Sequence, residues 1–596
     1  MPENKIKITP AKGRPMLNWV GKKPLDYVKG FPAQLVEVFD PVKSGRIIEL
    51  PAYEELKDNW QNLLFHGDNK DVLATLLELG FRGKIDLIYI DPPFKSGADY
   101  LRKVELRGIN NLERIKEDET SVLQQTMYFD IWNNDSYLQF MYERLMLLKE
   151  LLSETGNIYV HLDYRVVHYV KLIMDEIFGQ DNFRNEIIWF YPRGGDSEKQ
   201  FNRKHDTLLF YSKGEKWIFN YNEMLIPYTQ EQLERFEEED EKGKYYWNVN
   251  PRGERVKTYL RKKGIGEYDV WNIGINAAQI KEIGFSTTKP EALLERIIRA
   301  SSKDGSIVLD CFIGSGTTAR VAQKIGRKWI GCDINKGAIH ITSGEIQKII
   351  NEQEKKKEIK NPTFALYKVN NYDLKLLQTE AIELAIQHIG IQRTRTDRFF
   401  DGKLGKNLVK IIDFNHPLTL LELQLLEDEL KRRPDEDRDI TIICLGKELS
   451  VNPWIDEWNK KHPVNKIRLI ELKTDKKYGN FLIHKPAEAK VKIKRKNSKG
   501  IIEIKNFISP TIIERLNIDN KLFKVKIPDF RSMIDCVLVD SNYDGKTFHI
   551  LHSDVPEKKH DLIEGKYEIE IPKKKTKVAL KIIDMLGEEV FIVEEV

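Results

Sequence analysis

The sequence predicts an α/β protein that is built on a doubly wound, mostly parallel, Rossmann-like sheet. Apolar runs of strand length alternate with amphipathic helical segments over residues 60–190, a pattern typical of βαβ units. The alternation stops near residue 192, gives way to aromatic, basic and turn-rich sequence, and resumes over 290–335. We therefore expect one sheet with an insertion, followed by C-terminal α/β and β-rich domains.

The order of these segments predicts seven parts. The linker is a charged stretch, NEQEKKKEIKNP, which has no apolar periodicity. The final hundred residues are short alternating strands separated by turns. The expected boundaries are 1–59 for an N-terminal extension, 60–219 for the first half of the sheet domain, 220–284 for the insertion, 285–350 for the second half, 351–362 for the linker, 363–488 for a small α/β domain and 489–596 for a β-rich domain.

The composition is that of a globular protein without a membrane-spanning or secretory segment. Hydrophobic residues make up 41% and charged residues 32% of the 596 residues. No apolar run approaches the roughly 18–20 residues of a membrane span, and the N-terminus lacks the apolar core of a signal peptide. The four cysteines lie far apart without a metal-type spacing. We therefore expect reduced thiols, a cytoplasmic protein and no metal site.

The first candidate site follows the apolar run at 87–90. This run is apolar on both alternating faces, which is typical of a buried parallel strand. Asp91, Pro92, Pro93 and Phe94 come directly after it. Because proline cannot donate to a sheet ladder, the two prolines should lie just past the carboxyl end of the strand, where open α/β sheets bind ligands. A strand that is merely stopped by prolines is the simpler interpretation of these residues alone.

A second candidate site follows the strand at 307–310. Gly314 and Gly316 permit a tight turn and a close backbone approach that a Cβ would block. Asp310 closes this strand and could face a cationic amine. Asp333 ends the next strand, where doubly wound sheets place an acid that accepts hydrogen bonds from ribose hydroxyls. The loop is neither a G-x-G-x-x-G turn nor a P-loop, so the segment predicts a nucleoside-cofactor site of another type.

The acid-Pro-Pro-aromatic turn and the D-x-F-x-G-x-G-T-T turn together resemble those of the amino-methylating DNA methyltransferases, which use S-adenosylmethionine. The catalytic motif precedes the cofactor motif, an order similar to that of the β class, which includes solitary adenine methylases and the modification subunits of type III restriction systems. The resemblance covers roughly residues 15–350 and includes LFHGDNKDVL at 64–73 and TTKPEALLERII at 287–298. Thr288 departs from the family, which often has glutamine at this position.

The resemblance implies a direct methyl transfer to the exocyclic amine of adenine. The Asp91 carboxylate and the Pro92 carbonyl would each accept one amine hydrogen, and Pro93 would help to fix the direction of that carbonyl. Phe94 would stack on the base once it is flipped out of the duplex. No covalent enzyme intermediate is expected. The implied cofactor-binding residues are Asp310, Phe312, Gly314, Gly316, Thr317 and Asp333, with Lys289, Asp68 and Asn69 as further candidates.

Three of these candidates also have a simpler structural interpretation. Lys289 could reach the carboxylate of the cofactor, or it could be a solvated lysine at a helix start. Asp68 and Asn69 could approach the adenine ring, or they could cap the helix that begins beside them. Cys311 and Cys332 flank the cofactor loops, and we expect both to be small core residues.

The resemblance assigns target recognition to the insertion at 220–284. Arginine and lysine can contact phosphates or guanine edges, and aromatic rings can stack on bases. A solvated basic loop is the alternative for each residue taken singly. The polar segment 95–126, directly after the catalytic motif, is expected to form a mobile lid. The candidate DNA-binding residues are Arg252, Arg255, Lys257, Arg261 and Lys262.

The favoured function is site-specific adenine methylation of double-stranded DNA. N4-cytosine methylation is the first alternative, but permuted cytosine enzymes more often begin the motif with serine, so Asp91 favours adenine. The second alternative is a catalytically idle or partner-dependent DNA-binding subunit of a restriction-modification or defence complex. The candidate partners are double-stranded DNA, a restriction or defence subunit and a second copy of the chain in a homodimer; no membrane contact is expected.

Overall fold

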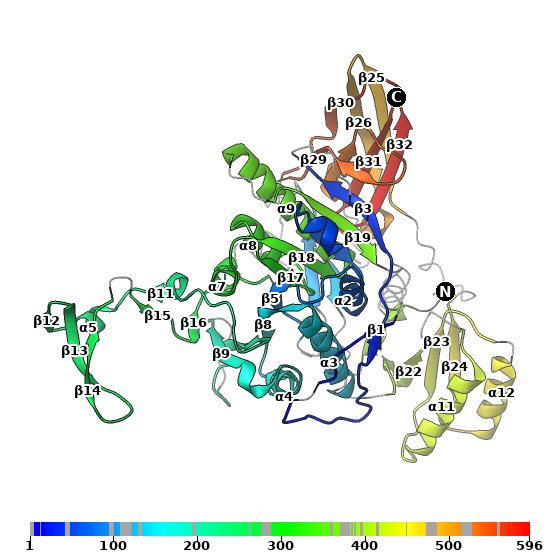
Figure 1. Cartoon of the computed structure of the whole chain (residues 1–596). Coiled ribbons are helices and arrows are strands. Elements are labelled where there is room, and N and C mark those ends of the chain that lie inside the picture. Colours follow the sequence, from blue (N-terminus) through cyan, green and yellow to red (C-terminus); the bar gives the residue numbers. More distant parts are fainter. Residues whose placement is uncertain are drawn as a thin grey trace. The chain divides into compact units, whose positions relative to one another are not determined.

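The computed structural model divides the chain into two compact units (Figure 1). The first unit comprises residues 1–370, 488–508 and 515–596, and the second comprises 371–487 with 509–514. The residues that the structure describes are 5–11, 13–41, 48–49, 51–93, 100–107, 122–128, 134–192, 198–261, 264–275, 288–357, 361–369, 382, 385–386, 389–393, 397, 399–412, 417–448, 450–472, 486–513, 527, 529–556 and 561–596.

One large mixed sheet organises the first unit (Figure 1). Its described strands follow the order β16-β9-β10-β8-β5-β17-β18-β4-β19-β3-β28. The run from β8 to β19 is parallel throughout, whereas β10 is antiparallel to both of its neighbours and β3 is antiparallel to β19. The strands span Ala33–Phe39 (β3), Asn62–His66 (β4), Ile85–Ile90 (β5), Leu152–Leu162 (β8), Phe183–Phe190 (β9), His205–Ser212 (β10), Val270–Asn272 (β16), Ile307–Asp310 (β17), Lys328–Asp333 (β18), Phe364–Val369 (β19) and Phe548–Ile550 (β28).

Helices cover both faces of this sheet, which confirms the predicted doubly wound α/β fold. Along β5, Ile88 and Ile90 pack into one hydrophobic core, while Leu87 and Tyr89 pack into the other, as the two-residue period of a strand requires. The first core is formed with α2 (Asn69–Glu78), α3 (Asn134–Leu151) and α4 (Val167–Phe178), and the second with α7 (Glu291–Ser301), α8 (Thr317–Lys324) and α9 (Lys336–Lys356).

The insertion contains its own small sheets. β11 (Leu225–Ile226) pairs with β15 (Ile265–Gly266), and a three-stranded antiparallel sheet lies between them in sequence. That sheet consists of β12 (Glu238–Asp240), β13 (Gly243–Val249) and β14 (Arg255–Tyr259). The chain then returns through β16, which pairs in parallel with β9. The insertion is therefore tied to the large sheet by its last strand.

The C-terminal segment of the first unit is rich in β-structure, as predicted. One antiparallel sheet contains β25 (Glu488–Lys496), β26 (Lys499–Ile508) and β30 (Lys566–Glu570), and another contains β29 (His552–Asp554), β27 (Ile534–Asp540), β31 (Lys577–Asp584) and β32 (Glu589–Glu595). β28 lies within this C-terminal segment in sequence, but it pairs with β3 and so extends the large sheet. A buried ion pair of 2.9 Å joins Lys581 on β31 to Glu37 on β3.

The second unit is a small α/β sheet, also as predicted. Its strands follow the order β20 (Gln392–Arg393), β21 (Gly402–Leu404), β22 (Asn407–Ile411), β23 (Ile440–Cys444) and β24 (Ile467–Glu471). The last three are parallel and alternate with α11 (Leu420–Lys431) and α12 (Val451–Lys461). Within the described parts of both units, no helix combines the length and apolar character that crossing a membrane requires.

Candidate active site

Three carboxylates meet at one edge of the large sheet. Asp91 follows β5, Asp310 ends β17 and Asp333 ends β18, and these three strands are parallel neighbours. Because the carboxyl ends of parallel strands lie at the same edge, the catalytic motif and the cofactor motif come together there. The structure thus unites two motifs that are far apart in sequence, as the resemblance implied.

Asp91 presents one engaged and one unengaged carboxylate oxygen. Its Oδ2 forms an ion pair with the ammonium of Lys289. Its Oδ1 is buried and has no hydrogen-bond partner among the described residues. Pro92 is buried and Pro93 is half-buried, whereas Phe94 lies outside the described residues. A buried acceptor without a donor costs free energy, so Oδ1 suits a ligand that brings an N–H group.

The glycine loop between β17 and α8 depends on two left-handed residues. Gly314 has φ 51° and Gly316 has φ 80°. The Gly314 N–H donates to Asp333 Oδ2 at 3.0 Å, so the carboxylate fixes the loop. A Cβ on Gly316 would lie 2.7 Å from Thr342 Oγ1. Thr317 begins α8 directly after this glycine.

Asp310 is buried and held by two local donors. The Phe312 N–H donates to Asp310 Oδ1 at 2.9 Å, and the Thr318 hydroxyl donates to Oδ2 at 2.6 Å. Burial raises the pKa of Asp310 to about 7 against these hydrogen bonds, and the charges of Asp91 and Asp333 add to the rise. A carboxyl group that ionises so reluctantly favours a cationic ligand nearby, because such a ligand would stabilise its charged form.

Asp333 also accepts from its own loop. Its Oδ1 accepts from the Asn335 N–H at 2.9 Å, in addition to the Gly314 N–H on Oδ2. An acid at the end of this strand in a doubly wound sheet can accept hydrogen bonds from ribose hydroxyls. A ribose contact therefore stays a prediction that is compatible with the geometry.

Lys289 lies against the catalytic motif. Its side chain is only 12% exposed, so the alternative of a solvated helix-start lysine is wrong. The residue precedes α7, whose N-cap is Pro290, and its ammonium reaches across to Asp91. Thr288 donates to Ser315 Oγ at 3.1 Å and thereby connects the same segment to the glycine loop. A contact of Lys289 with the carboxylate of a cofactor stays a prediction.

Asp68 adopts the capping arrangement that was its simpler interpretation, whereas Asn69 begins the helix. Asp68 caps α2 by accepting from the Lys70 N–H at 2.8 Å. Asn69 donates from Nδ2 to the Cys311 carbonyl at 3.1 Å and so connects α2 to the cofactor loop. An additional approach to an adenine ring stays a prediction. Cys311 and Cys332 are buried and free, as expected for small core residues.

Arg144 on α3 is a part of the site that sequence reasoning missed. Its guanidinium donates to Asn69 Oδ1 and to both carboxylate oxygens of Asp68, at 3.1 and 3.3 Å. It also stacks over Phe140 at 3.5 Å, and the Phe140 ring lies 6.0 Å from that of Phe312. The sequence signal for this role was an arginine on the apolar face of an amphipathic helix. A buried arginine needs partners for its charge, so such a position indicates a polar network.

Three of the candidate DNA-binding residues lie on the hairpin of β13 and β14 or at its turn. Arg255 lies 5.1 Å from the ring centroid of Trp247, and both are exposed. Lys257 forms a 2.6 Å ion pair with Asp240 and lies over Tyr245, so this lysine is partly engaged within the protein. Arg252 is exposed at the turn of the hairpin.

Arg261 lies just beyond the hairpin. It donates to the Tyr221 hydroxyl at 2.5 Å. Lys262 and the predicted recognition residues 276–284 lie outside the described part of the chain. The same holds for most of the predicted lid at 95–126, apart from β6 (Tyr100–Glu105), Leu106, Arg107 and β7, which spans Val122–Tyr128. The DNA-binding roles therefore stay predictions.

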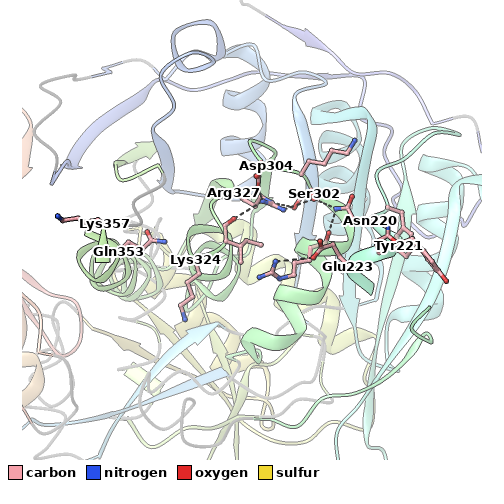
Figure 2. Close-up of a pocket in the computed structure, with 14 residues that line it drawn as sticks. Asn220, Tyr221, Glu223, Ser302, Asp304, Lys324, Arg327, Gln353 and Lys357 are labelled. Atoms are coloured by element: carbon pink, nitrogen blue, oxygen red, sulfur yellow. Dashed lines mark hydrogen bonds and ion pairs between the residues drawn. The ribbon is translucent and has the colours of Figure 1, made fainter. Parts of the chain in front are cut away.

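A separate cleft of about 1230 Å³ lies at the opposite edge of the sheet (Figure 2). Ser302 and Asp304 precede β17, and Arg327 precedes β18, so their side chains line the amino ends of the strands. Several of its basic groups are already paired, as Arg327 is with Asp304 and Lys324 with Glu291. This cleft is therefore distinct from the carboxylate edge.

Comparisons with known proteins agree with the geometry. A family model described as DNA methylase matches residues 85–344. The type II methyltransferase M1.MboII of Moraxella bovis is 34% identical over 216 residues, which cover 34% of this chain and 76% of that protein. The type II methyltransferase M.EcaI of Enterobacter cloacae is 30% identical over 326 residues, which cover 46% of this chain and 66% of that protein.

Two further kinds of relative match the same region. The DNA adenine methyltransferase YhdJ of Escherichia coli K12 is 27% identical over 280 residues, which cover 46% of this chain and 80% of that protein. Modification subunits of type III restriction-modification enzymes also match, and the chain spans between 44% and 62% of their length. The similarity to these relatives therefore covers about half of this chain.

Proposed function

Because this chain belongs to the DNA methylase family, we propose that it transfers a methyl group from S-adenosylmethionine to the N6 amine of adenine in duplex DNA. Family membership confirms the predicted enzyme class, a DNA methyltransferase. The observation that carries the proposal is the sheet edge where the buried, unengaged Oδ1 of Asp91 lies among the carboxylates at the ends of β17 and β18.

In the proposed reaction, Asp91 and Pro92 orient the amine. Asp91 Oδ1 accepts one amine hydrogen and the Pro92 carbonyl accepts the other, so that the nitrogen lone pair faces the methyl group. The target base must leave the stacked duplex to reach this edge, as chemistry on a paired base requires. Positioning and electrostatics then lower the barrier, and no covalent enzyme intermediate is needed.

The carboxyl ends of β17 and β18, together with the glycine loop, fit S-adenosylmethionine. When bound, this cofactor supplies the methyl group from its sulfonium. Asp310 is a buried carboxyl group that a cationic amine would stabilise in its charged form. The left-handed glycines bring the loop backbone close to a ligand without a side chain in the way. Asp333 would accept hydrogen bonds from the ribose hydroxyls, as acids at this place in doubly wound sheets do.

Adenine is favoured over cytosine as the target base. The first motif residue is Asp91, whereas permuted cytosine enzymes more often have serine there. One relative, YhdJ, is named as a DNA adenine methyltransferase. Methylation at N4 of cytosine would use the same amine chemistry, so the modified base must be identified directly.

The decisive experiment uses unmethylated genomic DNA, purified protein and S-adenosylmethionine. After digestion to nucleosides, mass spectrometry should detect N6-methyladenine with wild type and none with Asp91→Ala. Calorimetry should show that Asp91→Ala still binds S-adenosylmethionine, which separates loss of chemistry from loss of folding. N4-methylcytosine would overturn the base assignment, and no modified base despite cofactor binding would overturn the proposal for the isolated chain.

A partner-dependent role is the second candidate, and the type III relatives favour it. In that case the chain would act as the modification subunit beside a restriction or defence subunit, or as a homodimer. Purification of the tagged chain from its host, followed by mass spectrometry of bound proteins and light scattering, tests both arrangements. A monomer that methylates DNA alone would rule this candidate out.

A further inference from the structure

The C-terminal sheet of β25, β26 and β30 (Figure 1) carries a row of lysines on one face. Side chains of β25 alternate between an exposed face and a covered face, as the two-residue period of a strand requires. Val491, Ile493 and Arg495 belong to the covered face. After Glu488, the exposed face consists of lysine alone. These side chains form the lysine row: Lys490, Lys492, Lys494 and Lys496.

Two acids of the exposed face are already engaged by lysines of β26 and β30. The pairs, with distances of 2.5, 3.2 and 2.6 Å, are Glu503–Lys505, Glu503–Lys566 and Glu568–Lys499. Glu503 lies in the register opposite Lys492, yet both of its carboxylate oxygens are taken. Among the residues that the structure describes, no member of the lysine row forms an ion pair. The charges of the row are therefore not neutralised by this part of the protein.

A second basic segment is fixed at one end of the row. Arg495 lies between two members of the row in sequence but belongs to the covered face. Its guanidinium donates to the carbonyls of Pro572, Lys574 and Val596 at 3.0, 2.9 and 3.1 Å. The first two carbonyls belong to the turn between β30 and β31, in which Lys573 and Lys574 are exposed. The fold thus gathers cations from two separate segments of the sequence.

The spacing of the row makes its charges act together. Alternate residues of an antiparallel strand lie about 6.8 Å apart, which is less than the Debye length of about 8 Å at physiological ionic strength. Adjacent members therefore repel one another, and a linear polyanion relieves this repulsion. Duplex DNA carries one negative charge per about 1.7 Å of its axis, and the counterions that it releases on neutralisation favour binding.

We infer that the lysine row binds the sugar-phosphate backbone of duplex DNA, outside the contacts that position the target base. This inference rests on the proposed function, which makes duplex DNA the polyanion that the chain encounters. Lysine contacts a phosphate as a point charge, and phosphate contacts carry no sequence information. The row therefore adds affinity without sequence preference, which gives the C-terminal segment a role in holding the substrate.

Lysines on an edge strand also have a purely structural use. Among the described strands, β25 ends its sheet, and charged side chains there hinder pairing with another chain. That role needs no DNA, and it predicts self-association when the charges are removed. The two roles therefore differ in what the loss of these lysines changes, either the salt-dependent affinity for DNA or the oligomeric state.

The first test measures how DNA binding depends on salt. The row variant loses three adjacent charges: Lys492→Gln/Lys494→Gln/Lys496→Gln. The control variant loses three exposed lysines of the second unit: Lys460→Gln/Lys461→Gln/Lys466→Gln. Fluorescence anisotropy with a random-sequence duplex gives the slope of log affinity against log salt concentration. This slope should become less steep by about two to three in the row variant, and by less than about 0.5 in the control variant.

A third variant separates charge from strand packing: Lys492→Arg/Lys494→Arg/Lys496→Arg. It keeps all three charges and should keep the wild-type slope. Thermal melts and light scattering show whether each variant is folded and whether it associates. A change of slope no larger in the row variant than in the control variant would overturn the inference. Self-association of the row variant with an unchanged slope would assign the lysines to edge protection instead.

A footprint of the wild-type protein needs no substitution. A lysine-acylating reagent, followed by peptide mass spectrometry, compares each lysine in the free protein and in the DNA complex. DNA should protect the lysine row several-fold and leave Lys460 and Lys466 unchanged. Protection by vesicles that contain phosphatidylserine, but not by DNA, would overturn the inference in favour of a membrane surface.

The footprint also distinguishes this inference from the proposed function. If DNA protects the row but wild type methylates no base, the proposed function fails and the DNA-binding surface stands. If wild type methylates DNA while the row stays unprotected, the proposed function stands and the inference fails.

Discussion

At the residue scale, Asp310 should control how cofactor affinity depends on pH. Burial raises its pKa to about 7, and the charges of Asp91 and Asp333 add to this rise. The hydrogen bonds from Thr318 and from the Phe312 N–H oppose it only in part. In the free protein at pH 5.5 most Asp310 is therefore neutral. Because a cationic amine stabilises the ionised form, S-adenosylmethionine should bind about tenfold more tightly at pH 7 than at pH 5.5, with release of a proton at the lower pH.

Calorimetric titration at several pH values, in buffers of different ionisation enthalpy, measures both the affinity and the proton release. Asp310→Asn should bind the cofactor weakly and with little pH dependence over this range. If wild type shows a flat affinity between pH 5.5 and 7, Asp310 does not pair with a cationic group of the cofactor.

Gly316 offers a second prediction at the same scale. Any side chain there carries the cost of a left-handed backbone, about 1–2 kcal/mol, and its Cβ would also lie 2.7 Å from Thr342 Oγ1. Gly305 has nearly the same φ, 79°, but open space around it. In thermal melts, Gly316→Ala should lower stability more than Gly305→Ala and should also weaken cofactor binding. Equal losses of stability would mean that Thr342 moves aside without cost.

The site residues divide into those that sequence reasoning could reach and those that it could not. Asp91, Asp310 and Asp333 end or follow apolar runs, so parallel strand geometry alone brings them to one edge. Arg144 comes from a helix whose place beside the sheet edge is not written in a local pattern. Its role depends on its neighbours Asp68 and Asn69, which become visible only in the folded protein.

At the scale of the element, the hairpin of β13 and β14 is the part of the insertion best suited to DNA. Its register places Trp247 opposite Lys257, and Val249 opposite Arg255, on one face. Trp247 and Val249 are 40% and 61% exposed. A two-stranded ribbon fits the major groove, and an exposed aromatic beside arginine can contact bases or sugars while the arginine contacts phosphate.

Arg255→Ala should therefore weaken DNA binding and reduce by about one the slope of log affinity against log salt concentration. Lys244→Ala is the matched control, because it removes the same charge from β13, the paired strand of the hairpin, where Lys244 lies on the opposite face. Fluorescence anisotropy at several salt concentrations measures both slopes. The same salt slope for the two variants would assign the effect to net charge and not to the hairpin face.

The elements of the large sheet were predictable because their apolar periodicity is strong, whereas those of the insertion were not. The acidic run at 234–242 carries no strand pattern, yet Glu238–Asp240 form β12. Charge dominates its composition, and its strand conformation depends on pairing with β13 and on the ion pair between Asp240 and Lys257. Such tertiary pairing overrides local propensity.

At the scale of the whole molecule, the C-terminal segment completes the large sheet. β28 pairs with β3, an association between segments that are far apart in sequence. The alternating pattern predicted strands near the C-terminus, but no local pattern could show that one of them joins the first strands of the chain. The predicted domain boundaries stay predictions, yet this pairing gives the C-terminal residues a direct structural link to the catalytic region.

The buried ion pair between Glu37 and Lys581 should be the most sensitive part of that link. Burial alone would lower the pKa of Lys581, but the charges of Glu37 and Glu589 outweigh this effect and raise it, so the lysine stays charged. Lys581→Met leaves Glu37 buried without this cation and should lower the free energy of unfolding by about 3 kcal/mol. Lys577→Met, at an exposed position of the same strand, should change it by less than about 0.5 kcal/mol.

The double variant Glu37→Gln/Lys581→Met removes both charges and should recover part of the stability that Lys581→Met loses, because no buried charge is left unpaired. Hydrogen exchange then locates the effect: the amides of β3 and β28 should exchange faster in Lys581→Met than those of β5 and β17. If exchange rises equally throughout the sheet, the C-terminal segment and the catalytic strands unfold as one cooperative unit, and the ion pair stabilises the site as much as the edge.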